Sequence, residues 1–164
     1  MELILTGKQF VVPYNKNNLI RICDAKDVFD DISKDFKKLK ELPKKENKSD
    51  EKVIGIICQS YKLVMREDEY NISNPEIWGL AHNLGKYIFS QDQIVEFCRN
   101  HKTILFNDKM STVFLSRDET LGKIVTVRSE NHSLSVYYEE LGDLRIVPFI
   151  EIQVIVITDT IKSK

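Results

Sequence analysis

Two side chains in the middle of the sequence could form a nucleophile–base pair. Cys98 and His101 stand three residues apart in a segment with helical periodicity, so both would lie on one helix face. A thiol beside an imidazole is the arrangement of an activated cysteine, and both groups also bind zinc. Cys98 directly follows Phe97, however, and cysteine is among the most frequently buried residue types. We therefore favour core packing and keep a small enzyme using Cys98 and His101 as an alternative function.

A zinc site at this pair would need ligands from distant parts of the chain. The other cysteine and histidine residues are Cys23, Cys58, His82 and His132. The sequence has no CxxC, HExxH or DxDxDG motif, and it lacks a Walker lysine motif, a GxGxxG motif and a GxSxG elbow. We predict no metal site and no cofactor, and we favour a protein that is not an enzyme.

A second candidate is a DNA-binding unit. Two expected helices, 75–88 and 91–101, are joined by a two-residue connection and followed by hairpin strands, which is the order of a winged helix. If this unit bound DNA, Lys123 and Arg128 of the wing should gather beside Arg99 on one positive surface. A winged-helix DNA-binding regulator is therefore a second alternative function.

The charge balance argues against nucleic acid as a partner. The 164 residues contain 24 basic and 25 acidic side chains, which gives a net charge of −1. Binding through bulk electrostatics needs a cationic surface, and this chain offers no such field. The expected helix 91–101 also exposes Asp92 and Glu96, where a recognition helix would carry positive charge. Nucleic acid is thus a disfavoured partner.

Lysines are concentrated between residues 37 and 48, which hold six lysines and two acidic residues. This cluster could bind RNA, a membrane surface or an acidic partner. Alternatively, it is the C-terminal end of a helix, where positive charge complements the dipole, followed by a charged flexible linker over 43–52. We favour the second interpretation. The candidate binding residues of the cluster are Lys37, Lys38, Lys44 and Lys45.

Two adjacent tyrosines are the best candidates for contact with a protein. Tyr137 and Tyr138 lie on an expected strand, so they point to opposite faces and one of them should be exposed. Exposed tyrosine is enriched at protein interfaces, and a strand at Leu134–Tyr138 could pair with a partner or with its own copy. We predict a small, non-catalytic binding or regulatory protein that acts through a protein partner. Formation of a homo-oligomer is compatible with this function.

Hydrophobic periodicity places helices in the first two thirds of the chain. Apolar residues at three- and four-residue spacing follow Asp24 as far as Leu39, with acidic residues early and lysines late. The segment Val53–Cys58 is ambiguous between strand and helix, and the spacing up to Val64 favours a helix. Asn74-Pro75 and the capping box Ser90-Gln91-Asp92-Gln93 mark the two helix starts that follow.

Strands are expected at both ends of the chain. Gly7-Lys8 is interpreted as a tight turn between two short N-terminal strands, and Val154–Ile157 is apolar on both faces, which indicates an interior strand. Short gaps between the C-terminal strands favour an antiparallel meander. The expected strands are Leu3–Leu5, Gln9–Val12, Leu19–Ile22, Thr103–Phe106, Ser111–Leu115, Lys123–Arg128, Leu134–Tyr138 and Arg145–Thr158.

We therefore predict one α+β domain over residues 1–164, with an antiparallel sheet made of the C-terminal meander and the N-terminal strands. Helices from residues 24–101 should pack on one face of this sheet. The first residues lack the basic and apolar regions of a signal peptide, and no apolar run approaches the ~20 residues of a membrane helix. We expect a cytoplasmic protein with no membrane partner. Its 18 lysines against 6 arginines, 19 isoleucines and 2 alanines indicate an AT-rich genome.

Overall fold

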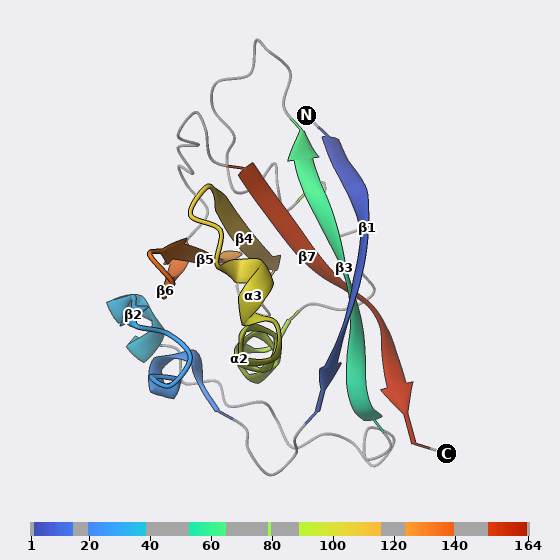
Figure 1. The fold of residues 1–164 in the computed structure, drawn as a ribbon. Helices are drawn as coiled ribbons and strands as arrows, with labels where there is room; N and C mark the ends of the chain where they lie inside the picture. Colours follow the sequence, from blue (N-terminus) through green and yellow to red (C-terminus); the bar gives the residue numbers. More distant parts are fainter. Residues whose placement is uncertain are drawn as a thin grey trace.

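A mixed β-sheet organises the described part of the chain (Figure 1). The computed structural model describes residues 2–14, 20–38, 53–64, 79, 89–115, 124–139 and 151–163. Within these residues seven strands follow one another in the order β1-β3-β7-β4-β5-β6-β2. The strands are β1 (Glu2–Pro13), β2 (Asp31–Ile32), β3 (Val53–Val64), β4 (Met110–Leu115), β5 (Ile124–Glu130), β6 (Ser133–Glu139) and β7 (Glu151–Lys162).

The fold is broadly α+β, but the expectation of a purely antiparallel sheet was wrong. Strands β4, β5 and β6 form the expected antiparallel meander, whereas β7 pairs parallel to β4 and β2 pairs parallel to β6. The composition of β7 explains its position, because Ile152–Ile157 is buried on both faces. A strand that is apolar on both sides is more stable between two neighbours than at the end of a meander. It accordingly lies between β3 and β4, as the interior strand that its sequence predicted.

The tight hairpin between β5 and β6 confirms the short connection expected between the strands Lys123–Arg128 and Leu134–Tyr138. Asn131 and His132 both have a positive φ, of 50° and 64°, and the register runs on without interruption from Glu130 opposite Ser133. Two consecutive left-handed residues match the right-handed twist of paired strands, and asparagine tolerates this conformation well.

Two short α-helices, α2 (Gln91–Asn100) and α3 (Lys102–Leu105), lie over one face of the sheet (Figure 1). The start of α2 confirms the capping box, since Ser90 is the N-cap and its amide donates to Oε1 of Gln93 at 3.0 Å. Helix α3 replaces the strand expected at Thr103–Phe106, so that expectation was wrong. The expected helix 75–88 lies outside the described residues except for Gly79, and so does the expected linker 43–52.

The long helix expected from Asp24 to Leu39 is not formed within the described residues. A 3₁₀ helix η1 (Ile22–Asp24), the short strand β2 and a second 3₁₀ helix η2 (Lys34–Lys38) take its place. Its predicted apolar residues from Ala25 to Phe36 nevertheless pack in the core, with Phe29 and Phe36 fully buried. The aspartates between them favour local turns over a continuous helix, and Asp30 binds the edge of β6 instead.

The segment favoured as a helix after Val53 is strand β3, paired with β1 on one side and β7 on the other. Its β-branched residues suit a strand with neighbours on both sides, and this tertiary pairing outweighs the ambiguous spacing.

The expected strand Leu19–Ile22 was also wrong where it is described, because Ile22 begins η1. The expected turn at Gly7-Lys8 was wrong too. β1 is one strand with a bulge in which Thr6–Lys8 opposes Ser60, and Gly7 takes a φ of 80° there.

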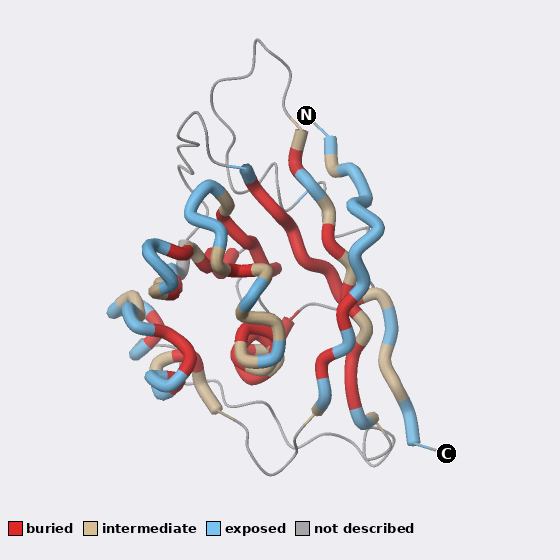
Figure 2. Tube along the Cα trace, viewed as in Figure 1, coloured by how far each residue is buried: buried red, intermediate tan, exposed pale blue. Residues whose placement is uncertain are grey.

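Burial is concentrated on β7, on β4 and on the inner face of α2, whereas the first half of β1 is exposed (Figure 2). The larger cluster lies between α2 and the sheet, with Phe97 edge-on to Phe10 and Phe114. A second cluster occupies the opposite sheet face and contains Leu63, Val113, Leu115, Ile124, Ile152, Val154 and Val156. Among the described residues, no helix is long and apolar enough to span a membrane.

Candidate functional site

Strand β1 lies at one end of the sheet and pairs only with β3 among the described strands. From Ile4 to Gln9 every residue is exposed. Ile4 and Leu5 stand on opposite faces with 46% and 49% of their surfaces open to solvent. A strand at the end of a sheet presents unpaired backbone N–H and C=O groups along its outer side. The N-terminal half of β1 therefore combines an outer edge that pairs with no other described strand with exposed apolar side chains.

The C-terminal half of β1 is protected in several ways. The bulge at Thr6–Lys8 interrupts the regular ladder before this half begins. Nε2 of His101, at the end of α2, lies 3.0 Å from the carbonyl oxygen of Val11 and forms a hydrogen bond with it. Pro13 ends the strand without an amide donor, as is usual at a sheet edge. These features leave residues Glu2–Leu5 as the part of β1 that can accept another strand.

At the other end of the sheet, the short strand β2 covers part of β6. Strand β2 lies along β6 and pairs Asp31 and Ile32 with Ser135 and Val136. The expectation that Leu134–Tyr138 offers a free edge to a partner was therefore wrong for residues 134–136, which bond to β2 and its flanking residues. Backbone bonds from β2 and its flanking residues occupy acceptors that a partner strand would need.

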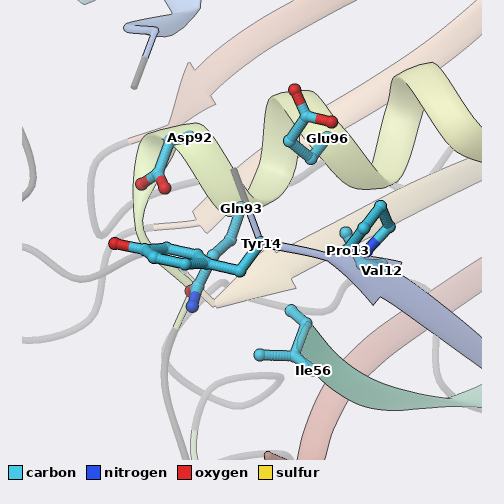
Figure 3. A pocket seen from close by; sticks show the side chains of 7 residues that line it. All are labelled: Val12, Pro13, Tyr14, Ile56, Asp92, Gln93 and Glu96. Carbon is cyan, nitrogen blue, oxygen red and sulfur yellow. The ribbon is translucent and has the colours of Figure 1, made fainter. Parts of the chain in front are cut away.

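A small pocket lies where the end of β1 meets the first turns of α2 (Figure 3). Its empty volume is about 260 Å³ including open solvent at its mouth, below the size usual for small-molecule sites. In Figure 3 the ring of Tyr14 lies beneath the helix and its hydroxyl points toward the same side as the Asp92 carboxylate. The pocket is lined by Val12, Pro13, Tyr14, Ile56, Asp92, Gln93 and Glu96.

Asp92 is buried, so the expectation that the helix 91–101 exposes it was wrong, and this burial raises the pKa of its carboxyl group. The Ser90 hydroxyl opposes this shift, because it donates to Oδ1 of Asp92 at 2.6 Å and stabilises the ionised form. Desolvation is the larger effect. The pKa of the Asp92 carboxyl group therefore lies above that of an exposed aspartate.

The second carboxylate of the pocket is already engaged in an ion pair. Glu96 pairs with Arg99 on the next turn of α2, and Arg99 also contacts Oδ2 of Asp27 at 2.9 Å. The side-chain amide of Asn100 donates from Nδ2 to the backbone carbonyl of Glu96 at 2.7 Å. The Arg99–Asp27 pair connects the turn that follows η1 to α2. Among the described acids of the pocket, only Asp92 has no cationic partner.

No family model, no curated protein and no solved structure matches this chain. The function of the chain is therefore inferred from the positions and contacts of its own residues. Within the described residues, no group of three or more potential metal ligands gathers in one place.

Cys98 and His101 both lie at the end of α2, but in different surroundings. Cys98 is fully buried, and desolvation raises the pKa of its thiol strongly. His101 packs against the rings of Phe10 and Phe97 and binds the Val11 carbonyl. The contacts of the imidazole with Phe10 and with the Val11 carbonyl connect the end of α2 to β1. The geometry supports the packing interpretation of this pair.

The other predicted binding residues are partly described. Lys37 is exposed on η2, Tyr137 is 37% exposed on β6, and the guanidinium carbon of Arg128 lies 5.7 Å from the Tyr137 ring centroid. The side chains of Lys38 and Tyr138, and all of Lys44 and Lys45, lie outside the described part of the chain.

Arg99 and Arg128 do not share a surface. Arg99 is on α2 and is neutralised by Asp27 and Glu96, whereas Arg128 is on the sheet face opposite this helix. Lys123, the third residue of the expected positive surface, lies outside the described residues. The two described members thus do not form the cluster expected of a winged-helix protein.

Sequence reasoning missed both the exposed half of β1 and the pocket above Tyr14. The run Leu3-Ile4-Leu5 was recognised as a strand, but no local signal shows which strand ends a sheet. One sequence signal could have indicated the pocket. Asp92 lies within the capping box, next to the residues that form the buried face of α2.

Proposed function

We propose that this chain is a small non-catalytic binding protein that captures an extended segment of a protein partner as an additional strand beside β1. The observation that carries the proposal is the exposed edge at Glu2–Leu5, with Ile4 and Leu5 open to solvent on opposite faces. Strand addition uses backbone hydrogen bonds for affinity and alternate side chains for specificity.

The surroundings of this edge indicate which segment fits. Leu5 lies opposite Tyr61 on the face of the second core cluster, and Ile4 lies opposite Lys62 on the other face. A partner strand could thus extend an apolar surface on the Leu5 side. Lys62 is exposed and paired with Glu151 at 3.2 Å, so the other side is polar beside Ile4. An amphipathic strand, with apolar residues toward Leu5, is the expected ligand.

The proposal can be tested by selecting short random peptides on the purified protein and measuring their affinity for variants. Leu5→Lys places a charge on the edge and should weaken binding by about tenfold or more, as charged residues block strand pairing. Ile54→Lys is the matched control, because Ile54 is equally apolar and 51% exposed but lies on β3. Selected peptides that bind Leu5→Lys as tightly as the wild type would contradict the proposal.

A further inference from the structure

A polar row crosses the sheet face opposite α2, next to an otherwise apolar cluster. Arg128 on β5 lies in register between Ser111 on β4 and Ser135 on β6. Tyr137 is the next residue along β6 on the same face, because side chains alternate along a strand. Two strands, β3 and β7, separate this row from β1, so it is independent of the proposed edge.

Two contacts hold the arginine side chain in place. Nε of Arg128 donates to the Ser111 hydroxyl at 3.1 Å, and the guanidinium lies over the Tyr137 ring at 5.7 Å. Ser111 is buried, which makes the first contact a fixed one. Stacking on a ring uses the face of the guanidinium and leaves its N–H edges available. The two terminal nitrogens of Arg128 are therefore held in position and have no hydrogen-bond partner among the described residues.

Arg128 has no acidic partner among the described residues, although it is only partly exposed. The other two described arginines differ in this respect. Arg21 pairs with Asp24 at 3.2 Å, and Arg99 pairs with Asp27 and Glu96. A half-buried cation loses hydration and gains from an anion that replaces it. An oriented guanidinium without a carboxylate is thus a site that an external anion would complete.

The polar groups around Arg128 offer donors for such an anion. The Ser135 hydroxyl has no described partner, and it stands directly across the strands from Arg128. Oγ1 of Thr126, opposite Tyr137, is buried and has no hydrogen-bond partner. Thr126 adds a polar group that the fold itself does not satisfy. The guanidinium of Arg128 and the Ser135 hydroxyl can both donate hydrogen bonds to an anion.

We propose that Arg128, Ser135 and Tyr137 form a binding site for a carboxylate, such as an acidic side chain or a peptide C-terminus. The planar fork of arginine matches the two oxygens of a carboxylate. A doubly charged phosphate would require more positive charge than one arginine supplies, and exposed Glu130 lies two residues away on the same face. The Tyr137 ring would contact the apolar part of the ligand.

The test is a titration of the protein with sodium acetate at constant ionic strength, followed by the backbone amide ¹⁵N–¹H resonances of Ser129 and Tyr137, which every variant retains. We expect a saturable shift. Arg128→Lys keeps the charge but loses the fork, and should weaken acetate binding by about tenfold. Ser135→Ala should weaken it without altering the Arg128–Ser111 bond. Arg21→Lys, at a paired and partly exposed arginine, is the matched control and should leave binding unchanged.

Three results would overturn the carboxylate site. A shift that grows linearly without saturating would show general ionic effects only. Equal affinity of the wild type and a folded Arg128→Lys variant would show that the fork is not used. Inorganic phosphate that binds more tightly than acetate would assign the site to a dianion instead. If Arg128→Lys fails to fold, as judged by the dispersion of its amide spectrum, Ser135→Ala decides between these outcomes.

Discussion

Asp30 and Leu134 exchange two hydrogen bonds across the end of the sheet. The Asp30 amide donates to the Leu134 carbonyl at 2.8 Å, and the Leu134 amide donates to Oδ2 of Asp30 at 2.9 Å. A side-chain carboxylate thus replaces the backbone acceptor of a neighbouring strand. The Glu2–Leu5 edge has no such cap among the described contacts, and this difference between the two ends of the sheet is the basis of the proposed function.

Replacement of Asp30 by alanine should destabilise the protein by roughly 1–3 kcal/mol, because the Leu134 amide loses a charged acceptor at a partly buried position. Asp30→Asn should cost less, since the amide oxygen can still accept. Asp31→Ala is the control, because Asp31 is exposed and its side chain makes no described hydrogen bond. Urea unfolding measures these differences. Equal stabilities of the Asp30→Ala and Asp31→Ala variants would show that the cap contributes nothing.

The raised pKa of Asp92 makes a specific contribution to the pH dependence of stability. Since the folded protein holds the proton more tightly than the unfolded chain, ionisation of Asp92 disfavours folding. This penalty is absent below the unfolded pKa and grows as pH rises through the folded pKa. Asp92→Asn should therefore be more stable than the wild type at neutral pH, and the difference should vanish toward pH ~4.

Unfolding curves of both proteins across this pH range provide the measurement. Other carboxylates, such as Glu96 in its ion pair, contribute with the opposite sign but cancel in the difference between wild type and variant. A stability difference that grows as pH falls would contradict the expected sign.

The three cysteines should differ in their reactivity toward a thiol reagent. Cys58 and Cys98 are buried, and desolvation raises the pKa of Cys58 to about 12. Cys23 is half-buried and should react first in the native protein. The other two thiols should react only as the protein opens, and Cys23→Ser should abolish the fast phase. Rapid modification of Cys98 in the native state would instead favour the enzyme alternative.

A buried row of hydrogen bonds connects β3, β7 and β4 on the α2 face. The Ser60 hydroxyl donates to Oε1 of Gln153 at 2.7 Å, and Nε2 of Gln153 donates to the Thr112 hydroxyl at 3.2 Å. Ser60→Ala leaves a buried acceptor unsatisfied and should cost roughly 1–3 kcal/mol. The same change at exposed Ser163 should cost nothing measurable.

The cost of Ser60→Ala is attributed to the acceptor that it leaves unsatisfied. Replacing Ser60, Gln153 and Thr112 together by apolar residues of similar shape tests this cause. The triple variant Ser60→Ala, Gln153→Met, Thr112→Val should be less destabilised than the sum of its single changes, because no partner is left unsatisfied. Thermal unfolding compares the set. Strict additivity would show that the residues act independently.

Local signals predicted the elements that depend on neighbouring residues. The capping box at Ser90 and Gln93 correctly placed the start of α2, and the two-sided apolar run Val154–Ile157 correctly indicated an interior strand. Both features are decided by a few adjacent residues, since a cap bonds within its own first turn and a strand's two faces are read directly from alternation.

Elements decided by distant contacts were not predictable in this way. The spacing of Val28, Phe29 and Phe36 fits a helix, but the same residues fill the core from short turns once Asp30 binds Leu134, 104 positions away. Likewise, Leu3–Leu5 was recognised as a strand, whereas its place at the end of the sheet depends on β3 and β7. The Arg128–Tyr137 contact arises from the register of β5 and β6.

Amide-resolved hydrogen exchange with and without a bound peptide tests the strand-capture function most directly. Backbone pairing at the free edge should slow the exchange of outward-facing amides among Glu2–Leu5, and the amides near Val11 and on α2 should keep their rates. Binding that slows exchange elsewhere and leaves Glu2–Leu5 unchanged would contradict the account.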